Sequence, residues 1–273
     1  MLNFNFRRAV SVCCETGDLR TCNQDRIFFR DGIINKKSVG LYAVADGCGG
    51  MSYGSEISQL IVNELGRRYE QDLPDLVFMK KIKTDTVLER LRIWMTEINH
   101  TAYEFGQSVH KPVGSTIVLL LIVENVYYLL SSGDSRIYRF RNHSVQRLTV
   151  DQTKLSDMLR NGEISPEMAA TYPEKNVLTM CVGFFEHPQF YCASGKIKRN
   201  DIFLLCSDGL YNAYTENELE AAIPLQIEQN SAIELRNGIS LGAARDNVSA
   251  VIVQIVSSNN SKHSGIFDAF FHK

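Results

Sequence analysis

Apolar residues along the 273-residue chain follow two kinds of pattern. Six segments are rich in β-branched and aromatic residues and predict β-strands. They are Val39–Ala45, Ser115–Glu124, Val126–Ser132, Arg136–Phe140, Ile202–Cys206 and Val248–Val256. Several are apolar throughout, which is typical of central strands covered on both faces. A tight hairpin turn is expected at Glu124-Asn125, between the second and third segments.

Other segments place apolar residues three and four apart, which predicts amphipathic helices from Ser55 and from Thr84. Pro74 lies between these two helices and should break helical continuity there. Ser231–Ala244 is a third helix candidate. The polar stretch Thr153–Asn176 predicts short surface helices with a turn at Asn161-Gly162.

The order of these elements does not show the regular strand–helix alternation of a parallel α/β protein. It favours an α+β fold in which two central, mostly antiparallel sheets pack together with helices outside them. The composition, with 44% hydrophobic and 22% charged residues, is that of a globular protein with a substantial core.

Charge and cysteine content narrow the classes of protein further. The net charge is only −2 and no basic block occurs, so nucleic acid is not an expected partner. The longest apolar run, Thr116–Val123, is too short for a membrane span, and the first residues lack a secretory signal. The seven cysteines include no CxxC pair, which favours reduced thiols and a cytoplasmic location over disulfides or zinc.

Four aspartates stand at the ends of predicted strands, most of them beside glycine: Asp46, Asp134, Asp208 and Asp246. Carboxylates fixed at the rim of a core suit Mg²⁺ or Mn²⁺, which prefer oxygen ligands, and suit zinc poorly. Asp-Gly is also a common turn dipeptide, so each instance taken singly is better explained as a turn. Asp134 could equally pair with Arg136. From these residues alone, a metal site and a set of turns both stay open.

Eight short motifs, in order along the chain, resemble those of the metal-dependent (type 2C, PPM-type) protein serine/threonine phosphatases. They are Gly17–Asp25 (GDLRTCNQD), Asp46–Gly50 with Gly54 and Glu56, Gly114–Thr116, Gly133–Arg136 with Tyr138, Leu148–Asp151, Asn176–Thr179 with Gly183, Ser207–Gly209 and Asp246–Asn247. Each motif is short, but the ordered set is specific.

The resemblance implies a four-layer α-β-β-α sandwich, with residues 1–256 as one phosphatase domain. It further implies a flap subdomain at about 153–176 and a C-terminal tail at 257–273. The spacing of the motifs resembles bacterial members, so phosphorylated proteins and a cognate serine/threonine kinase are the expected partners of a monomeric enzyme. The cofactors implied are two Mn²⁺ or Mg²⁺ ions, with a third ion at a weaker site.

Roles for individual residues follow from their places in the motifs. By resemblance, Asp46 bridges two metal ions and the Gly47 carbonyl helps to hold one of them. Asp208 and Asp246 bind the other ion, and Asp25 acts through metal-bound water.

Asp134 matches the residue that, with Asp208, holds the third ion, and Arg20 matches the arginine that binds the substrate phosphate. A planar guanidinium suits two phosphate oxygens, which lysine does not mimic. The implied reaction is direct attack on phosphorus by a metal-bridging hydroxide, without a phospho-enzyme.

The chain departs from the family pattern at Cys48, where eukaryotic members often carry histidine. A thiol beside two cations should have a lowered pKa, which predicts reversible inhibition by peroxide. A small buried residue at a tight turn is the alternative. Met180 and Gln152 also differ from the common residues, but neither matches a metal ligand.

Two other functions remain open at this point: a non-catalytic relative that binds phosphoproteins, and a hydrolase of small phosphate esters. Loss of a core aspartate would favour the first, and all of them are present. Activity on nucleotides or sugar phosphates instead of phosphopeptides would favour the second. The apolar end Ile266–Phe271 is either a docking peptide or a segment that packs on the domain.

Overall fold

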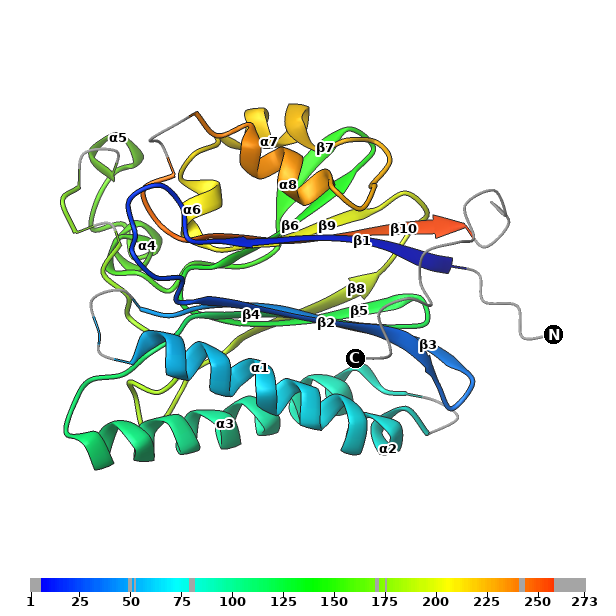
Figure 1. Cartoon of the computed structure of the whole chain (residues 1–273), viewed down its shortest axis with the longest axis horizontal. Helices are drawn as coiled ribbons and strands as arrows, with labels where there is room; N and C mark the ends of the chain where they lie inside the picture. Colours follow the sequence, from blue (N-terminus) through cyan, green and yellow to red (C-terminus); the bar gives the residue numbers. More distant parts are fainter. Residues whose placement is uncertain are drawn as a thin grey trace.

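Two five-stranded sheets stacked face to face form the centre of the molecule (Figure 1). The computed structural model describes residues 6–48, 51, 53–78, 82–169, 172–174, 176–240 and 244–257. One sheet has the strand order β1-β10-β9-β6-β7 and the other β2-β3-β4-β5-β8. The strands are β1 (Phe6–Glu15), β2 (Asp25–Ile34), β3 (Lys37–Asp46), β4 (Ile117–Val123), β5 (Val126–Ser132), β6 (Arg136–Arg141), β7 (Ser144–Arg147), β8 (Tyr191–Lys196), β9 (Ile202–Cys206) and β10 (Val248–Ser257). Neighbouring strands pair antiparallel throughout.

The central strand β4 is apolar at every position because both of its faces are buried. In β4, Leu119 and Leu121 pack in the core shared with the helices. Leu120 and Ile122, which point the other way, pack in the core between the two sheets. Both faces of the strand therefore need hydrophobic side chains, and no polar position remains.

Helices cover the outer face of each sheet, which gives the predicted four layers (Figure 1). On the sheet that contains β2 and β3 the helices are α1 (Gly54–Gln71), α2 (Leu73–Phe78) and α3 (Thr84–Val109). On the other sheet they are α6 (Asp208–Tyr211), α7 (Glu216–Ala222) and α8 (Ser231–Asn237). The predicted α+β sandwich is thus confirmed.

Four strands have no counterpart among the six predicted ones, and all four are sheet edges. They are β1, β2, β7 and β8. Edge strands are partly exposed and carry charged residues, so they lack a continuous apolar run. In β2, for example, Arg26, Arg30 and Asp31 interrupt the hydrophobic pattern. The helix expected at Ser231–Ala244 is shorter than predicted and ends at Asn237, before Gly238.

The polar stretch around residues 153–176 forms two short helices, α4 (Lys154–Arg160) and α5 (Pro166–Ala169), neither with a buried residue. Gly162 adopts a φ of 72°, which confirms the turn predicted there. Its role as a flap stays a prediction, as do the domain boundaries. The C-terminal residues from 258 lie outside the described part of the chain. Among the described helices, none combines the length and the apolar character needed to cross a bilayer.

Candidate active site

The strand-end aspartates come from both sheets and lie at one end of the sandwich. Asp25 begins β2 and Asp46 ends β3, and the two are paired across these antiparallel strands. Asp208 follows the end of β9 and Asp246 precedes the start of β10, and β9 and β10 are also antiparallel neighbours. Asp134 lies in the connection that leads from β5 in one sheet to β6 in the other.

These carboxylates are close enough to raise one another's pKa. Burial raises the pKa of Asp46 well above its usual value, and the charges of Asp25, Asp208, Asp134 and Asp246 raise it further. Burial also raises the pKa of Asp208 to about 7, with Asp134 and Asp246 as the next causes. A group of carboxylates that disfavour each other's ionisation is a site for positive charge.

Asp134 belongs to this group, and it is not the ion-pair partner of Arg136. Burial raises its pKa to about 6, followed by the charge of Asp151, while Arg136 and the Tyr211 hydroxyl act in the opposite direction. Arg136 instead forms its ion pair with Asp151, at 2.7 Å, and its guanidinium carbon lies 3.6 Å from the centre of the Tyr211 ring. The suggested Asp134–Arg136 turn pair is therefore wrong, because Asp151 takes the arginine.

Asp25 is fully buried and only partly satisfied by hydrogen bonds. The Ser207 hydroxyl donates to its Oδ2 at 2.8 Å, whereas Oδ1 has no hydrogen-bond partner among the described residues. Burial raises the pKa of Asp25. The role of Ser207 was not predicted, although a hydroxyl residue stands directly before a strand-end aspartate in the sequence. The unpaired oxygen leaves one buried acceptor available to a cation or to water.

Gly47 brings the chain next to Asp46 into close contact with the start of α1. A Cβ atom at Gly47 would lie 2.5 Å from the carbonyl carbon and oxygen of Gly54, both backbone atoms. The Gly47 amide donates to the carbonyl oxygen of Gln24 at 3.2 Å. Only glycine fits this close approach, so the turn after Asp46 depends on it.

Arg20 lies at the rim, in the loop that joins β1 to β2, and forms an ion pair with Asp246. Its Nε donates to Oδ1 at 2.8 Å and its Nη2 to Oδ2 at 2.6 Å. Asn247 holds the same loop: its Oδ1 accepts from the Gln24 amide at 2.8 Å, and its Nδ2 donates to the Thr16 carbonyl at 2.8 Å. Asp246 and Asn247 together thus fix the position of the loop that carries Arg20.

The Cys48 thiol lies in contact with the Cys181 thiol. Its pKa is raised well above the usual value, first by its hydrogen-bonding contact with the Cys181 thiol and then by burial. The carboxylates of Asp46 and Asp134 act in the same direction. In the absence of metal ions, the protein's own groups favour a neutral thiol. The lowering of the Cys48 pKa by two bound cations, and the peroxide sensitivity that would follow, stay predictions.

The residues at this end of the sandwich fit a hard divalent cation. The donors are carboxylate and carbonyl oxygens, and Asp25 offers a buried, unpaired one. Within the described ranges, no three His, Cys, Asp or Glu side chains already form a metal-binding group, and Asp246 is engaged by Arg20. Mg²⁺ and Mn²⁺ sites retain several waters and need few protein ligands, so sparse ligation is compatible with them.

The same fold and chain length occur in known phosphatases. The structure of the catalytic domain of the serine threonine protein phosphatase PstP in complex with two manganese ions is similar, with a TM-score of 0.75 and 24% identity over 92% of this chain and 100% of that one. Serine/threonine phosphatase stp of Listeria monocytogenes is 28% identical over 88% of this chain and 93% of its own. Protein phosphatase PhpP of Streptococcus pneumoniae is 27% identical over 90% of this chain and 97% of its own.

The fold and the relatives together define a class of phosphatase. Residues 19–232 match the family model described as Protein phosphatase 2C, which is more than half of the chain. The chain belongs to the protein phosphatase 2C family of protein serine/threonine phosphatases. The predicted family and enzyme class are thereby confirmed.

Proposed function

We propose that this chain hydrolyses phosphoserine and phosphothreonine in proteins with the help of Mn²⁺ or Mg²⁺ ions. The names of its relatives support the substrate class, and the manganese ions of the PstP structure support the metal. The natural partner is then a serine/threonine kinase whose products this enzyme dephosphorylates.

The ions are proposed to be held by the strand-end oxygens at one end of the sandwich. These belong to Asp25, Asp46, Gly47, Asp134, Asp208 and Asp246. Two ions would occupy the main positions, with a third near Asp134 and Asp208. When bound, such ions would lower the pKa of water enough to supply hydroxide as the nucleophile at neutral pH, and they would offset charge on the phosphoryl oxygens.

Arg20 is proposed to bind the phosphate of the substrate. Its guanidinium is half exposed at the rim, and its Nε and Nη2 form the fork that now holds Asp246. The same two N–H groups match two phosphate oxygens. Because the pair with Asp246 is solvent-exposed, replacing one anion by another costs little.

Ser207 and Asn247 are proposed to position the groups that react. Ser207 donates a hydrogen bond to Asp25 and accepts one from the Ser249 amide at 3.0 Å, so it fixes the orientation of a fully buried carboxylate. Asn247 ties the loop that carries Arg20 to the start of β10. Neither residue needs to touch the substrate for its loss to impair catalysis.

The proposal is carried by one observation: carboxylates from both sheets lie close enough to raise each other's pKa, beside an arginine at the rim. A direct test compares phosphate release from a phosphothreonine peptide with release from nucleotides and sugar phosphates, in Mn²⁺.

We expect the phosphopeptide to be preferred. Asp46→Asn should lower the rate of phosphate release from it more than about 100-fold, which exceeds the loss typical for residues that only support a metal ligand. Asp75→Asn, an exposed carboxylate in α2, is the matched control. A protein that binds Mn²⁺ and phosphopeptide without releasing phosphate would be a non-catalytic relative. A preference for small esters would reassign the substrate class.

A further inference from the structure

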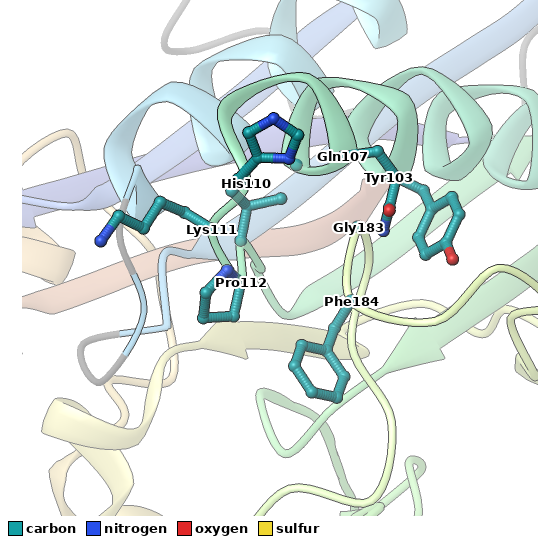
Figure 2. Close-up of a pocket in the computed structure, with 9 residues that line it drawn as sticks. Tyr103, Gln107, His110, Lys111, Pro112, Gly183 and Phe184 are labelled. Atoms are coloured by element: carbon teal, nitrogen blue, oxygen red, sulfur yellow. The ribbon is translucent and has the colours of Figure 1, made fainter.

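A recess of about 240 Å³ opens at the C-terminal end of α3, outside the cluster of carboxylates (Figure 2). Its wall includes two residues of the last turns of α3, three residues of the segment that follows, and one residue beyond Gly183. These are Tyr103, Gln107, His110, Lys111, Pro112 and Phe184. Figure 2 shows the His110 and Lys111 side chains on one side of the recess and the Phe184 ring on another.

The backbone around the recess is held firmly in place. His110 ends α3 in a left-handed conformation with a φ of 53°, and the Lys111 amide donates to the Gly106 carbonyl at 3.2 Å. Gly183, which also lines the recess, donates its amide to the fully buried Asn99 of α3 at 2.9 Å, and Asn99 donates to the Phe185 carbonyl at 2.8 Å. The recess is therefore preformed and does not depend on a mobile loop.

The charge of the residues that line the recess favours an anionic ligand. The wall contains one lysine and one histidine but no carboxylate. Lys111 is exposed, and it takes part in no ion pair among the residues that the structure describes. The carboxylate nearest along α3, Glu104, does not line the recess and pairs with His100 at 3.3 Å. An acidic side chain would find a cation here, with the Phe184 ring and Pro112 to cover its apolar stem.

The recess is linked to the candidate active site by two paired backbone segments. Val182, next to Gly183, exchanges both backbone hydrogen bonds with Ser115, at 2.9 and 3.0 Å. Ser115 in turn pairs with Gly47, the neighbour of Asp46. Adjacent paired segments lie about 4.8 Å apart, so two steps place the recess roughly 10 Å from Gly47. An extended peptide rises about 3.3 Å per residue, which makes this roughly three residues.

We propose that this recess binds an acidic side chain of the phosphoprotein substrate, about three residues from the phosphorylated serine or threonine. Lys111 is the specificity-determining residue, and it acts as an exposed point charge. The inference rests on the proposed phosphatase function and names the kind of sequence that this enzyme prefers. Because the contact is solvent-exposed, its effect should be modest and should weaken as salt is added.

The test uses phosphothreonine peptides that are identical except for one position, which is glutamate or lysine. The variable position is placed three residues before the phosphothreonine in one pair and three residues after it in another. For the parent protein in Mn²⁺, we expect kcat/KM to favour glutamate by roughly threefold in one of the two pairs, mainly through KM.

Three variants make the result specific. Lys111→Met should abolish the preference, and Lys111→Glu should reverse it. Lys36→Glu makes the same charge change at the exposed turn between β2 and β3, and it should leave the preference unchanged. Hydrolysis of p-nitrophenyl phosphate, which has no flanking residues, should be equal in all four proteins.

The inference is overturned if glutamate and lysine peptides are hydrolysed equally in both pairs, or if Lys36→Glu shifts the preference as much as Lys111→Glu. Those outcomes leave the phosphatase function intact, since phosphate is still released. Absence of any hydrolysis, including that of p-nitrophenyl phosphate, would instead reject the proposed function and this inference with it.

Discussion

The guanidinium of Arg20 holds the carboxylate of Asp246 through two parallel hydrogen bonds, at 2.8 and 2.6 Å. Arg20 is proposed to bind phosphate and Asp246 to bind metal. In the absence of both, each side chain occupies the hydrogen-bonding groups that the other needs for its proposed ligand. Both side chains are substantially exposed, with 42% and 35% of their surface accessible. The pair is thus weak enough to open when phosphate and metal arrive.

Arg20→Ala should therefore impair catalysis much more than stability. The free energy of unfolding should change by less than about 1 kcal/mol, because exposed ion pairs contribute little. kcat/KM for a phosphopeptide should fall roughly 10- to 100-fold, which is the loss expected when hydrogen bonds to a charged group are removed. Arg20→Lys should recover only part of this loss, since lysine lacks the planar fork. Equal activity of Arg20→Ala and the exposed control Arg67→Ala would contradict the assignment.

The clustered carboxylates should make the metal-free protein less stable as pH rises. The pKa values of Asp208 and Asp134 are raised to about 7 and about 6 in the folded protein, above the usual aspartate value near 3.9. The folded state therefore binds more protons than the unfolded state between these limits. The contribution of these two groups to the free energy of unfolding is therefore fully present below about pH 4, and it is lost as the pH rises through 6 and 7.

Asp208→Asn isolates this effect. In the absence of metal the variant should be more stable than the parent at pH 8, by on the order of 2 kcal/mol, and the difference should shrink towards pH 5. Adding Mn²⁺ at pH 8 should raise the melting temperature of the parent more than that of the variant, which keeps the other proposed ligands. Chemical unfolding at several pH values measures the difference, and a variant less stable than the parent at pH 8 would refute the electrostatic account.

Gly47→Ala should destabilise the protein and disturb the site. The added methyl group would meet the Gly54 backbone at 2.5 Å, and backbone atoms cannot move aside as a flexible side chain does. We expect a loss of about 1–3 kcal/mol together with weaker Mn²⁺ binding. Gly66→Ala is the control: it lies inside α1 with its nearest contact at 3.5 Å, and should stabilise by about 0.5–1 kcal/mol. Similar behaviour of the two variants would argue against the close approach.

Ser207→Ala should weaken metal binding without removing any proposed ligand. Asp25 would lose the donor that stabilises its charged form, and the buried Ser249 amide would lose its acceptor. We expect a destabilisation of about 1–3 kcal/mol and a 10- to 100-fold weaker affinity for Mn²⁺, measured by calorimetry. The hydroxyl of Ser131 is buried and has no hydrogen-bond partner in the part of the chain that the structure describes, so Ser131→Ala should be nearly neutral. Unchanged Mn²⁺ affinity in Ser207→Ala would remove Ser207 from the site.

Hydrophobic patterning predicted the centre of the fold and missed its borders. β4 is buried on both faces and apolar at every position, and the buried part of β5 is polar only at Ser131 and Ser132, its last two residues. β7 has no buried residue at all, and β2 alternates irregularly, because an edge strand contacts the core on only part of its surface. Polar residues are tolerated at such positions, and the periodic signal disappears.

The aspartates of the site were predictable because each follows or precedes a strongly apolar strand. Their partners were not. Whether Asp134 pairs with Arg136, or Arg136 with Asp151, depends on how the connection from β5 to β6 approaches the segment after β7. The contact of Cys48 with Cys181 joins residues 133 positions apart, so no local pattern could have indicated it.

The central claim is that the strand-end carboxylates hold divalent ions that are required for phosphate release. Its most direct test is to strip the purified protein of metal and titrate it with Mn²⁺ while measuring phosphate released from a phosphothreonine peptide. We predict no release without metal and a saturable rise with Mn²⁺ in the parent. Folded Asp46→Asn should show no such rise. Release that needs no metal, or that Asp46→Asn supports equally well, would contradict the account.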